Sequence, residues 1–478
     1  MPLWAAALTA ALSMGVVDVD PGRAGGPAPG LGDPGTSADV ANPTVEGPIT
    51  GGIHGHPWYD PAFEVGSQGY VEEEYFLSGV ARSHPAGTSA AYKTRILVIR
   101  PASPLRFNGT VVVEWDNVTA QAAFSPMFAW AHPLLLRDGY AFVSVSAQAA
   151  GVCCSPLSHF VWDPLRYGSL IHPEDVYSFD IYSQAIESLV HPSPPPEDPL
   201  GGLVVNKVIA VGQSQSANRL HTYVNEVHNA VDLIDGFIID AGGSKNFPTP
   251  PSDPVIHFLS EDGITAAAPD RMGHPNYRLW EAPAASHNDA DTARHIDGGQ
   301  AQRNAIPGWP QFPYSEDERL HAEGLHYGEE GPSTYAGCQV LGEGGNEYPR
   351  RYAVQAALDH MNRWVTDGVA APQPPRVQFT GSTIARDDFG HPLGGVRLPP
   401  IDVPVARYFA TTCALFGHTV ALDPATLLEL YPTHADYVSA MQAATDAAVG
   451  AGFMLAEDGE ELMGMAEASA IPFGLWAP

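Results

Sequence analysis

One serine in this chain stands where its hydroxyl group could be activated as a nucleophile. Residues 208–212 form an apolar run rich in β-branched side chains, and Ser214 follows on a tight turn before a helix-forming segment. A strand-turn-helix of this kind strains the serine backbone and points the first helical amides at the space above its hydroxyl. The pattern therefore predicts a nucleophile at Ser214. Ser216 occupies the position where the usual template has a second glycine, and the alternative is an ordinary loop with a buried or capping serine.

A carboxylate and a histidine follow Ser214, each after another strand-like run. Residues 254–260 end in Glu261 and Asp262, and His287 comes after the run 277–280. Because a serine hydroxyl is a poor nucleophile near neutral pH, a histidine must take its proton and a carboxylate must orient that histidine. Because the chain has 19 histidines, a histidine after a strand is weak evidence by itself. The evidence lies in the order of serine, carboxylate and histidine along the chain. It predicts His287 as general base and either Glu261 or Asp262 as the acid.

The elements that must position these side chains alternate between strand and helix patterns. Alternation of this kind predicts parallel β-α-β units and a mostly parallel sheet covered by helices on both faces, starting with antiparallel strands. The expected strands are 70–81, 95–100, 110–116, 140–147, 207–212, 233–240, 254–260 and 277–281, and the expected helices are 126–138, 174–191, 215–229 and 352–365. The serine, the carboxylates and the histidine would then all lie at carboxyl ends of strands, where open α/β sheets place their chemistry.

Several collinear stretches together resemble the α/β-hydrolase family called Abhydrolase_10, over roughly residues 45–470. They are residues 69–79, 108–115, 117–119, 166–170, 172–173, 212–216, 278–281 leading to His287, and 430–432 with His434 and Tyr437. The resemblance implies an α/β-hydrolase fold, with Ser214 as nucleophile, His287 as base and Glu261 as the preferred acid. Asp262 is the alternative acid.

An acyl transfer also needs two hydrogen-bond donors for the negative oxygen that develops in its transition state. One is typically the amide after the nucleophile, here Gln215, and the other comes from the loop after an earlier strand. The amides of Asn117 and Val118, which follow the strand 110–116, are the candidates for the second donor. Alternatively, the side chain of Asn117 only orders this loop.

Four segments are expected along the chain. Residues 1–45 form an apolar and then Gly/Pro-rich leader, residues 46–287 the hydrolase core, and residues 288–350 an insertion. Residues 351–478 contain the closing helix of the core and a C-terminal extension. The insertion is long for a structureless loop, so it is a cap or a moving lid, or else a surface excursion that packs on the core.

Composition limits the partners of the chain. Lys and Arg number 23 against 54 Asp and Glu, a formal net charge of −31, which opposes binding to nucleic acid or to anionic membranes. Residues 3–17 resemble the apolar part of a signal peptide but no basic residue precedes them and they are short for a membrane span, so export and a cytoplasmic location both stay open. The sequence leaves the oligomeric state undetermined.

The cysteines and the remaining histidines suggest no metal site. Neither a C-x-x-C pair nor an H-E-x-x-H helix is present, so no metal and no cofactor is expected. Cys338 and Cys413 are the candidates for a disulfide between the insertion and the C-terminal extension, with buried free thiols as the alternative.

The function expected from these residues is hydrolysis of a small carboxylic ester through an acyl-enzyme intermediate on Ser214. The same chemistry serves amidases, peptidases and acyltransferases, because the pocket decides the substrate. A catalytically silent hydrolase fold that serves as a binding protein is the alternative from another class.

Overall fold

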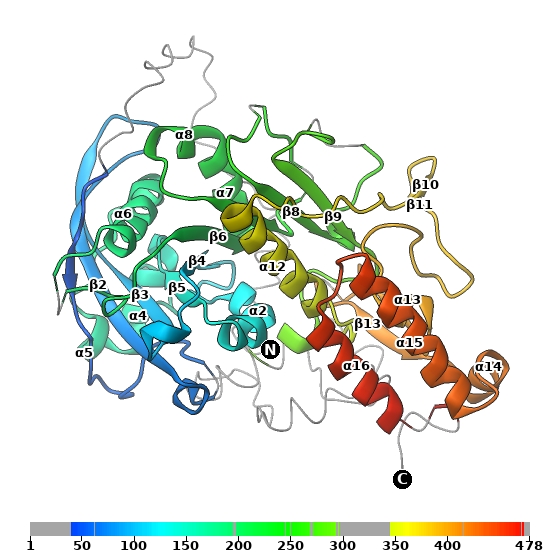
Figure 1. Cartoon of the computed structure of the whole chain (residues 1–478). Coiled ribbons are helices and arrows are strands. Elements are labelled where there is room, and N and C mark those ends of the chain that lie inside the picture. The colour runs from blue at the N-terminus through cyan, green and yellow to red at the C-terminus, as the bar shows by residue number, and fades with distance from the viewer. Residues whose placement is uncertain are drawn as a thin grey trace.

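A nine-stranded sheet forms the centre of the protein (Figure 1). The computed structural model describes residues 40–472 except 62, 195–196, 244, 249, 268–270, 293–294, 296–344, 414 and 470. The strand order is β1-β2-β3-β5-β4-β6-β7-β8-β9. The strands are β1 (Thr44–Glu46), β2 (Tyr70–Arg82), β3 (Ser89–Pro101), β4 (Thr110–Trp115), β5 (Ala141–Val145), β6 (Lys207–Gln213), β7 (Gly236–Asp240), β8 (Val255–Ser260) and β9 (Tyr277–Ala282).

The sheet is antiparallel at one edge and parallel through the rest, as predicted. β1, β2, β3 and β5 pair antiparallel, whereas every pair from β5 through β4 and β6 to β9 is parallel. All eight predicted strands are present. β3 begins at Ser89, six positions before the predicted start at 95, because it pairs along its whole length with β2 in a hairpin. The strand β1 was not predicted, because its three residues are too few to show a strand pattern in the sequence.

Helices cover both faces of the sheet, and the period of two along each strand assigns side chains to the faces. One face packs against α2 (Pro126–Arg137) and α12 (Arg351–Asp367), and contains Val112, Ile209 and Ile256. The other face packs against α6 (Ser178–Val190) and α7 (Gln215–Glu226). It contains the neighbouring positions Val113, Ala210 and Val255. The prediction of a mostly parallel sheet between two helical layers is confirmed.

The predicted helices differ from the observed ones mainly at their ends. The segment 174–191 begins with a 3₁₀ turn, Asp175–Tyr177, before α6, and the segment 215–229 divides into α7 and the short α8 (His228–Val231). Three further one-turn helices, α3 (Ala149–Val152), α4 (His159–Trp162) and α5 (Pro164–Tyr167), follow β5. The remaining short elements are the 3₁₀ turns Val65–Gln68, Pro104–Arg106 and Glu261–Gly263 and, after β9, the helix α9 (Ala290–Thr292).

The C-terminal extension packs on the same core as the sheet face under α12. Val405, Met441 and Leu462 of the extension belong to one buried cluster with Trp130 of α2 and Tyr352 of α12. In Figure 1 the helices α15 and α16 lie side by side next to the end of α12. The elements of the extension are β10 (Phe379–Thr380), β11 (Thr383–Ile384), α13 (Pro399–Asp402), β12 (Ala406–Phe409), β13 (His418–Ala421), α14 (Pro424–Leu430), α15 (His434–Gly450) and α16 (Ala456–Ala468).

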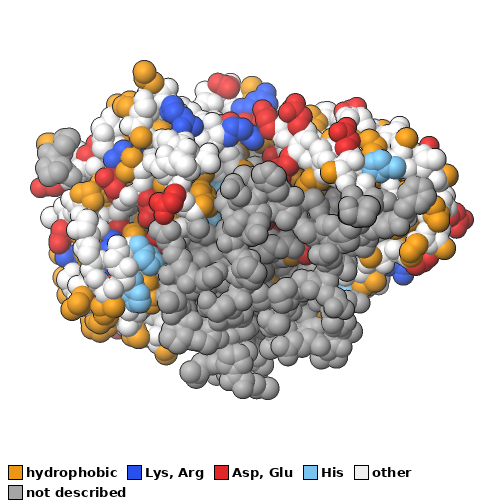
Figure 2. Space-filling view, turned by 90° about the horizontal axis from the view of Figure 1, so that it is seen from below, with side chains coloured by type: hydrophobic (Ala, Val, Ile, Leu, Met, Phe, Trp, Pro, Cys, Tyr) orange, Lys and Arg blue, Asp and Glu red, His pale blue; other side chains and the backbone are white. Residues whose placement is uncertain are grey.

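Most of the predicted leader and insertion lie outside the described residues, as does Cys338. Its predicted disulfide with Cys413 therefore stays a prediction. The structure does contain a disulfide between the adjacent residues Cys153 and Cys154, a pairing that was not predicted. Within the described part of the chain, no helix is long and apolar enough to cross a membrane. Acidic side chains are scattered over the described part of the face in Figure 2, as the net charge leads one to expect.

Candidate active site

Ser214 lies on a strained turn between the end of β6 and the start of α7. Its backbone angles are φ 60° and ψ −116°, a region that residues other than glycine rarely adopt. The Ser214 amide donates to the carbonyl of Asp240 at 2.8 Å, which ties the turn to the end of the neighbouring strand β7. The carbonyl of Ser214 accepts from the amide of Asn218 in the first turn of α7. The strand-turn-helix geometry predicted for Ser214 is therefore present.

Ser216 closes this turn in the position where the usual template has glycine. Its hydroxyl donates to the Gln213 carbonyl at 2.8 Å and accepts from the Gln213 amide at 3.0 Å. The residue is fully buried, and Gly212 lies so close that a Cβ atom there would stand 3.2 Å from the Ser216 carbonyl carbon. A small side chain is thus required at both positions. The hydroxyl of Ser216 adds two hydrogen bonds that a glycine could not make.

His287 follows β9 and pairs with Asp262, which follows β8. The Nδ1 atom of His287 lies 3.1 Å from Oδ2 of Asp262, and Ser260 donates to the other carboxylate oxygen at 2.5 Å. Burial by itself would raise the pKa of Asp262. The hydrogen bond and charge of His287, together with Ser260, outweigh burial and lower the pKa of Asp262 below its usual value. Asp262 is thus held as a carboxylate against one ring nitrogen of His287.

Glu261, the preferred acid from the sequence, is bonded elsewhere. Its Oε2 accepts from the amide of Ala284 at 2.9 Å, and its Oε1 pairs with Arg386. Glu261 and Asp262 are consecutive, and the short helical turn after β8 directs their side chains differently, so only one reaches His287. The structure therefore corrects this prediction: the alternative, Asp262, is the carboxylate beside the histidine.

The segments carrying Ser214 and His287 meet through Gln213. Its Nε2 atom donates to the carbonyl of His287 at 3.2 Å, so the residue before Ser214 touches the main chain of the predicted base. The other ring nitrogen of His287, Nε2, is buried and has no hydrogen-bond partner among the described residues. The structure thus holds no hydrogen bond between His287 and Ser214. Catalytic hydrogen bonds are often long without substrate and tighten only when it is bound.

The two candidates for the second oxyanion donor differ in what their amides already bind. The Asn117 amide donates to the carbonyl of Phe124 at 2.9 Å, so it is engaged within its own loop. The Asn117 side chain donates to the Gln213 carbonyl at 2.9 Å, which is the ordering role weighed as the alternative. The Val118 amide makes no hydrogen bond to any other described residue. The Val118 amide is therefore the stronger of the two candidates for the second donor.

The loop with Val118 is held against the helix α3. A Cβ atom on Gly151 would come within 2.8 Å of the Ala123 Cβ and 3.3 Å of a Val118 methyl group, so the absence of a side chain permits this contact. Just before α3, Gln148 accepts hydrogen bonds from Gln215 at 2.9 Å and from the Trp115 ring at 3.0 Å. The first residue of α7 and the last residue of β4 are thereby joined through one side chain.

Two buried residues beside the site were not predicted. Arg350 donates to the carbonyls of Ser286 and His287 at 3.1 Å each, and to Asp240 at 2.5 Å. Asp240 ends a predicted strand, so the reasoning that selected Glu261 and Asp262 could also have selected it. Arg350 had no such signal, because it lies 63 residues after His287 and belongs to no motif.

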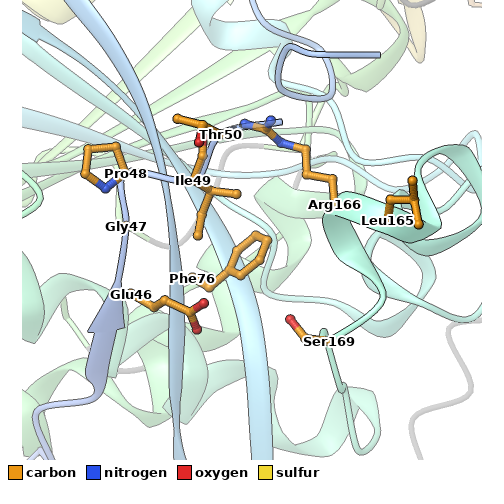
Figure 3. Close-up of a pocket in the computed structure, with 9 residues that line it drawn as sticks. All are labelled: Glu46, Gly47, Pro48, Ile49, Thr50, Phe76, Leu165, Arg166 and Ser169. Atoms are coloured by element: carbon orange, nitrogen blue, oxygen red, sulfur yellow. Dashed lines mark hydrogen bonds between the residues drawn. The ribbon is translucent and has the colours of Figure 1, made fainter. Parts of the chain in front are cut away.

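One pocket and one cluster of possible metal ligands lie on other parts of the fold than Ser214. A pocket of about 490 Å³ opens between the β1–β2 segment and α5 (Figure 3). Its charged members are already paired, Arg166 with Glu74 and Glu46 with Lys93. His228, Asp232 and Asp253 have the composition of a cation site, but they lie where β7 and β8 begin, whereas Ser214 lies where β6 ends.

The fold and this site define the class of the protein as an α/β-hydrolase. The strained serine after one parallel strand is followed along the chain by a carboxylate and then a histidine after later strands, which is the chain order of that class. A family model described as alpha/beta hydrolase domain matches residues 45–464, so the chain belongs to this family, Abhydrolase_10. The family predicted from the sequence is confirmed.

Several of the solved structures that match parts of the chain carry esterase names. Est22 is 18% identical over 40% of this chain and 51% of its own, with a TM-score of 0.25. Brefeldin A esterase, described as a bacterial homologue of human hormone sensitive lipase, is 12% identical over 38% and 44%, at 0.22. The Pyrococcus furiosus esterase Pf2001 is 10% identical over 52% and 88%, at 0.27. The chain thus spans about half the length of Est22. No curated protein sequence matches the chain significantly.

Proposed function

We propose that this α/β-hydrolase cleaves small carboxylic esters, with Ser214 as nucleophile, His287 as general base and Asp262 as the acid. The observation that carries the proposal is the pair of His287 and Asp262, held after β9 and β8 at the same edge of the parallel sheet as the strained Ser214, which follows β6. A buried carboxylate on one ring nitrogen orients the imidazole and stabilises its charged form. The other ring nitrogen is then available for a proton.

The reaction proceeds in two stages on these residues. Ser214 Oγ attacks the ester carbonyl while Nε2 of His287 takes the hydroxyl proton, and the proton then passes to the leaving alcohol. Water, deprotonated by the same nitrogen, attacks the acyl-enzyme, releases the carboxylic acid and restores Ser214. Both tetrahedral intermediates carry a negative oxygen, which the amides of Gln215 and Val118 stabilise by hydrogen bonds.

Gln215 is suited to this role because its amide is the first in α7. The first amides of a helix have no partner within the helix and lie at the positive end of its dipole. We assign the second oxyanion donor to the Val118 amide because, unlike the Asn117 amide, it has no hydrogen bond to another described residue. Asn117 instead positions the loop through the Gln213 carbonyl.

A fluorophosphonate probe tests the proposal because it reacts only with an activated serine. We expect labelling of the wild-type enzyme at the peptide containing Ser214, and hydrolysis of p-nitrophenyl acetate and longer p-nitrophenyl esters. Ser214→Ala should lose both, while Ser188→Ala should keep both, since the Ser188 hydroxyl is bonded to a carbonyl within α6.

The other functions on this fold give different results in the same experiment. An amidase, peptidase or acyltransferase would be labelled at Ser214 but would act faster on anilides or on an added alcohol acceptor than on esters. A silent binding protein would be neither labelled nor active, and that result would overturn the proposal.

A further inference from the structure

We propose that Arg350 is a positioning residue for this reaction, which ties the main chain of the base His287 to the end of β7, to which the turn with Ser214 is hydrogen-bonded. The proposal rests on the function proposed above, and it assigns a role to a residue from outside the core segment 46–287. Arg350 is the last residue of the predicted insertion and lies immediately before α12.

Arg350 is fully buried, and its planar guanidinium group donates hydrogen bonds to three acceptors. One terminal nitrogen donates to the carbonyls of both Ser286 and His287 at 3.1 Å. The other donates to a carboxylate oxygen of Asp240 at 2.5 Å. A guanidinium offers donors in a fixed plane, so it can set these groups at defined relative positions, which a lysine cannot do.

Asp240 connects Arg350 to the turn that carries Ser214. Its carbonyl accepts from the Ser214 amide at 2.8 Å, and its carboxylate binds Arg350. Arg350 binds the His287 carbonyl, which also accepts from Gln213, the residue before Ser214. The main chains of Ser214 and His287 are thus connected on two sides, through Gln213 directly and through Asp240 and Arg350.

Two aromatic rings contact the guanidinium group of Arg350 and hold it in position. Its central carbon lies 4.2 Å from the ring centre of Trp130 and 5.3 Å from that of Phe258. The Trp130 ring nitrogen in turn donates to Asp289, two residues after His287. Cation-π contact compensates in part for the removal of the guanidinium from water. The loop of His287 is therefore held at Ser286, His287 and Asp289 by one connected group.

Arg350 and Asp240 also depend on each other's charge. Both are fully buried, and burial raises the pKa of Asp240, although Arg350 and His287 oppose this. Removing either partner leaves an uncompensated buried charge, which strongly destabilises a protein. A test of positioning must therefore keep the charges balanced.

The variant Arg350→Lys keeps the positive charge beside Asp240 but loses the rigid planar group that donates hydrogen bonds to the carbonyls of Ser286 and His287. We expect its kcat for p-nitrophenyl acetate to fall about 10- to 100-fold, the size of effect seen when a reacting group moves by about 1 Å. Its KM should stay within about twofold, because Arg350 does not touch the substrate. The rate of labelling of Ser214 by the fluorophosphonate should fall in parallel.

The neutral double variant Asp240→Asn/Arg350→Gln is the second test, since it has no unpaired charge. It should fold and show the same loss of kcat with little change of KM. Arg351→Lys is the matched control: Arg351 is the next residue and is also buried, but it pairs with Glu461 of α16 and Asp291 of α9 and does not bind Asp240 or the His287 carbonyl, so kcat should not change.

The results separate the two proposals. Unchanged kcat per folded molecule in Arg350→Lys or in the double variant, with folding measured by circular dichroism at the assay temperature, would overturn the positioning role. A loss of activity that only follows the unfolded fraction counts as the same result. A wild-type enzyme that is neither labelled nor active would instead overturn the proposed ester hydrolysis, and with it the role of Arg350.

Discussion

The Nδ1 atom of His287 lies 3.1 Å from a carboxylate oxygen of Asp262, whereas the carboxylate of Glu261, the preceding residue, binds Arg386 and the amide of Ala284. Two adjacent acids thus have separate tasks. One faces the candidate base, and the other braces the turn that leads to it. This division allows their roles to be tested with a pair of isosteric substitutions.

We expect Asp262→Asn to lower kcat by on the order of 10⁴, because the amide favours the wrong tautomer of His287 and cannot stabilise its charged form. The measurement is steady-state hydrolysis of a p-nitrophenyl ester. Glu261→Gln is the matched control and should lower kcat by less than about tenfold, at a cost of about 1–3 kcal/mol in stability. A greater loss of kcat in Glu261→Gln than in Asp262→Asn would refute the assignment.

Gly151→Ala tests the loop that carries Val118. The added Cβ would come within 2.8 Å of the Ala123 Cβ, so the loop after β4 must shift. We expect kcat to fall about tenfold or more with KM little changed, because a displaced amide loses its bond to the oxyanion. Gly87→Ala, on an exposed turn with open space around it, is the control and should leave kcat unaltered. Equal kinetics in both variants would exclude Val118 as a donor.

Ser216→Ala tests whether this hydroxyl replaces the usual glycine by bracing the turn. Losing its two bonds to Gln213 should lower the free energy of unfolding by about 1–3 kcal/mol, as for a buried group left unsatisfied. Ser214 should still react with the fluorophosphonate. Thermal unfolding of this variant beside Ser188→Ala provides the measurement, and a smaller loss than in Ser188→Ala would contradict the bracing role.

Asp458 of α16 should make stability depend on pH near neutrality. Burial raises the pKa of Asp458 from 3.8 to about 7, with Arg351 opposing the shift. A group whose pKa is raised on folding stabilises the protein below its unfolded pKa, and this contribution is lost as the pH rises through the folded value. We therefore expect wild-type stability to decline between these two values.

The variant Asp458→Asn should lack this decline. Its free energy of unfolding should exceed that of the wild type at about pH 8, and the difference should shrink as the pH falls toward 4. Urea unfolding at several pH values is the measurement. Asp446→Asn, an exposed change on the neighbouring helix α15, is the control and should follow the wild-type curve. Parallel curves for the wild type and Asp458→Asn would contradict the prediction.

The sheet could be predicted because its strands carry their pattern locally. The run 208–212 is apolar throughout and the run 254–260 is mostly apolar, as expected for parallel strands covered on both faces, and both form strands in the structure. The start of β3 could not be predicted, because residues 89–94 pair with β2 only after the hairpin has formed. The end of α7 at Glu226 likewise depends on how the following turn packs.

By itself, the sequence determined the strand-turn-helix at Ser214, the chain order of serine, carboxylate and histidine, and hence the family. These features depend on residues close together in the chain, whose backbone preferences act locally. Only the tertiary structure placed Asp262 rather than Glu261 beside His287 and brought Arg350 to Asp240 and His287. Those contacts join residues from separate parts of the chain, and the direction of a side chain toward a distant partner is set by packing, which no local pattern encodes.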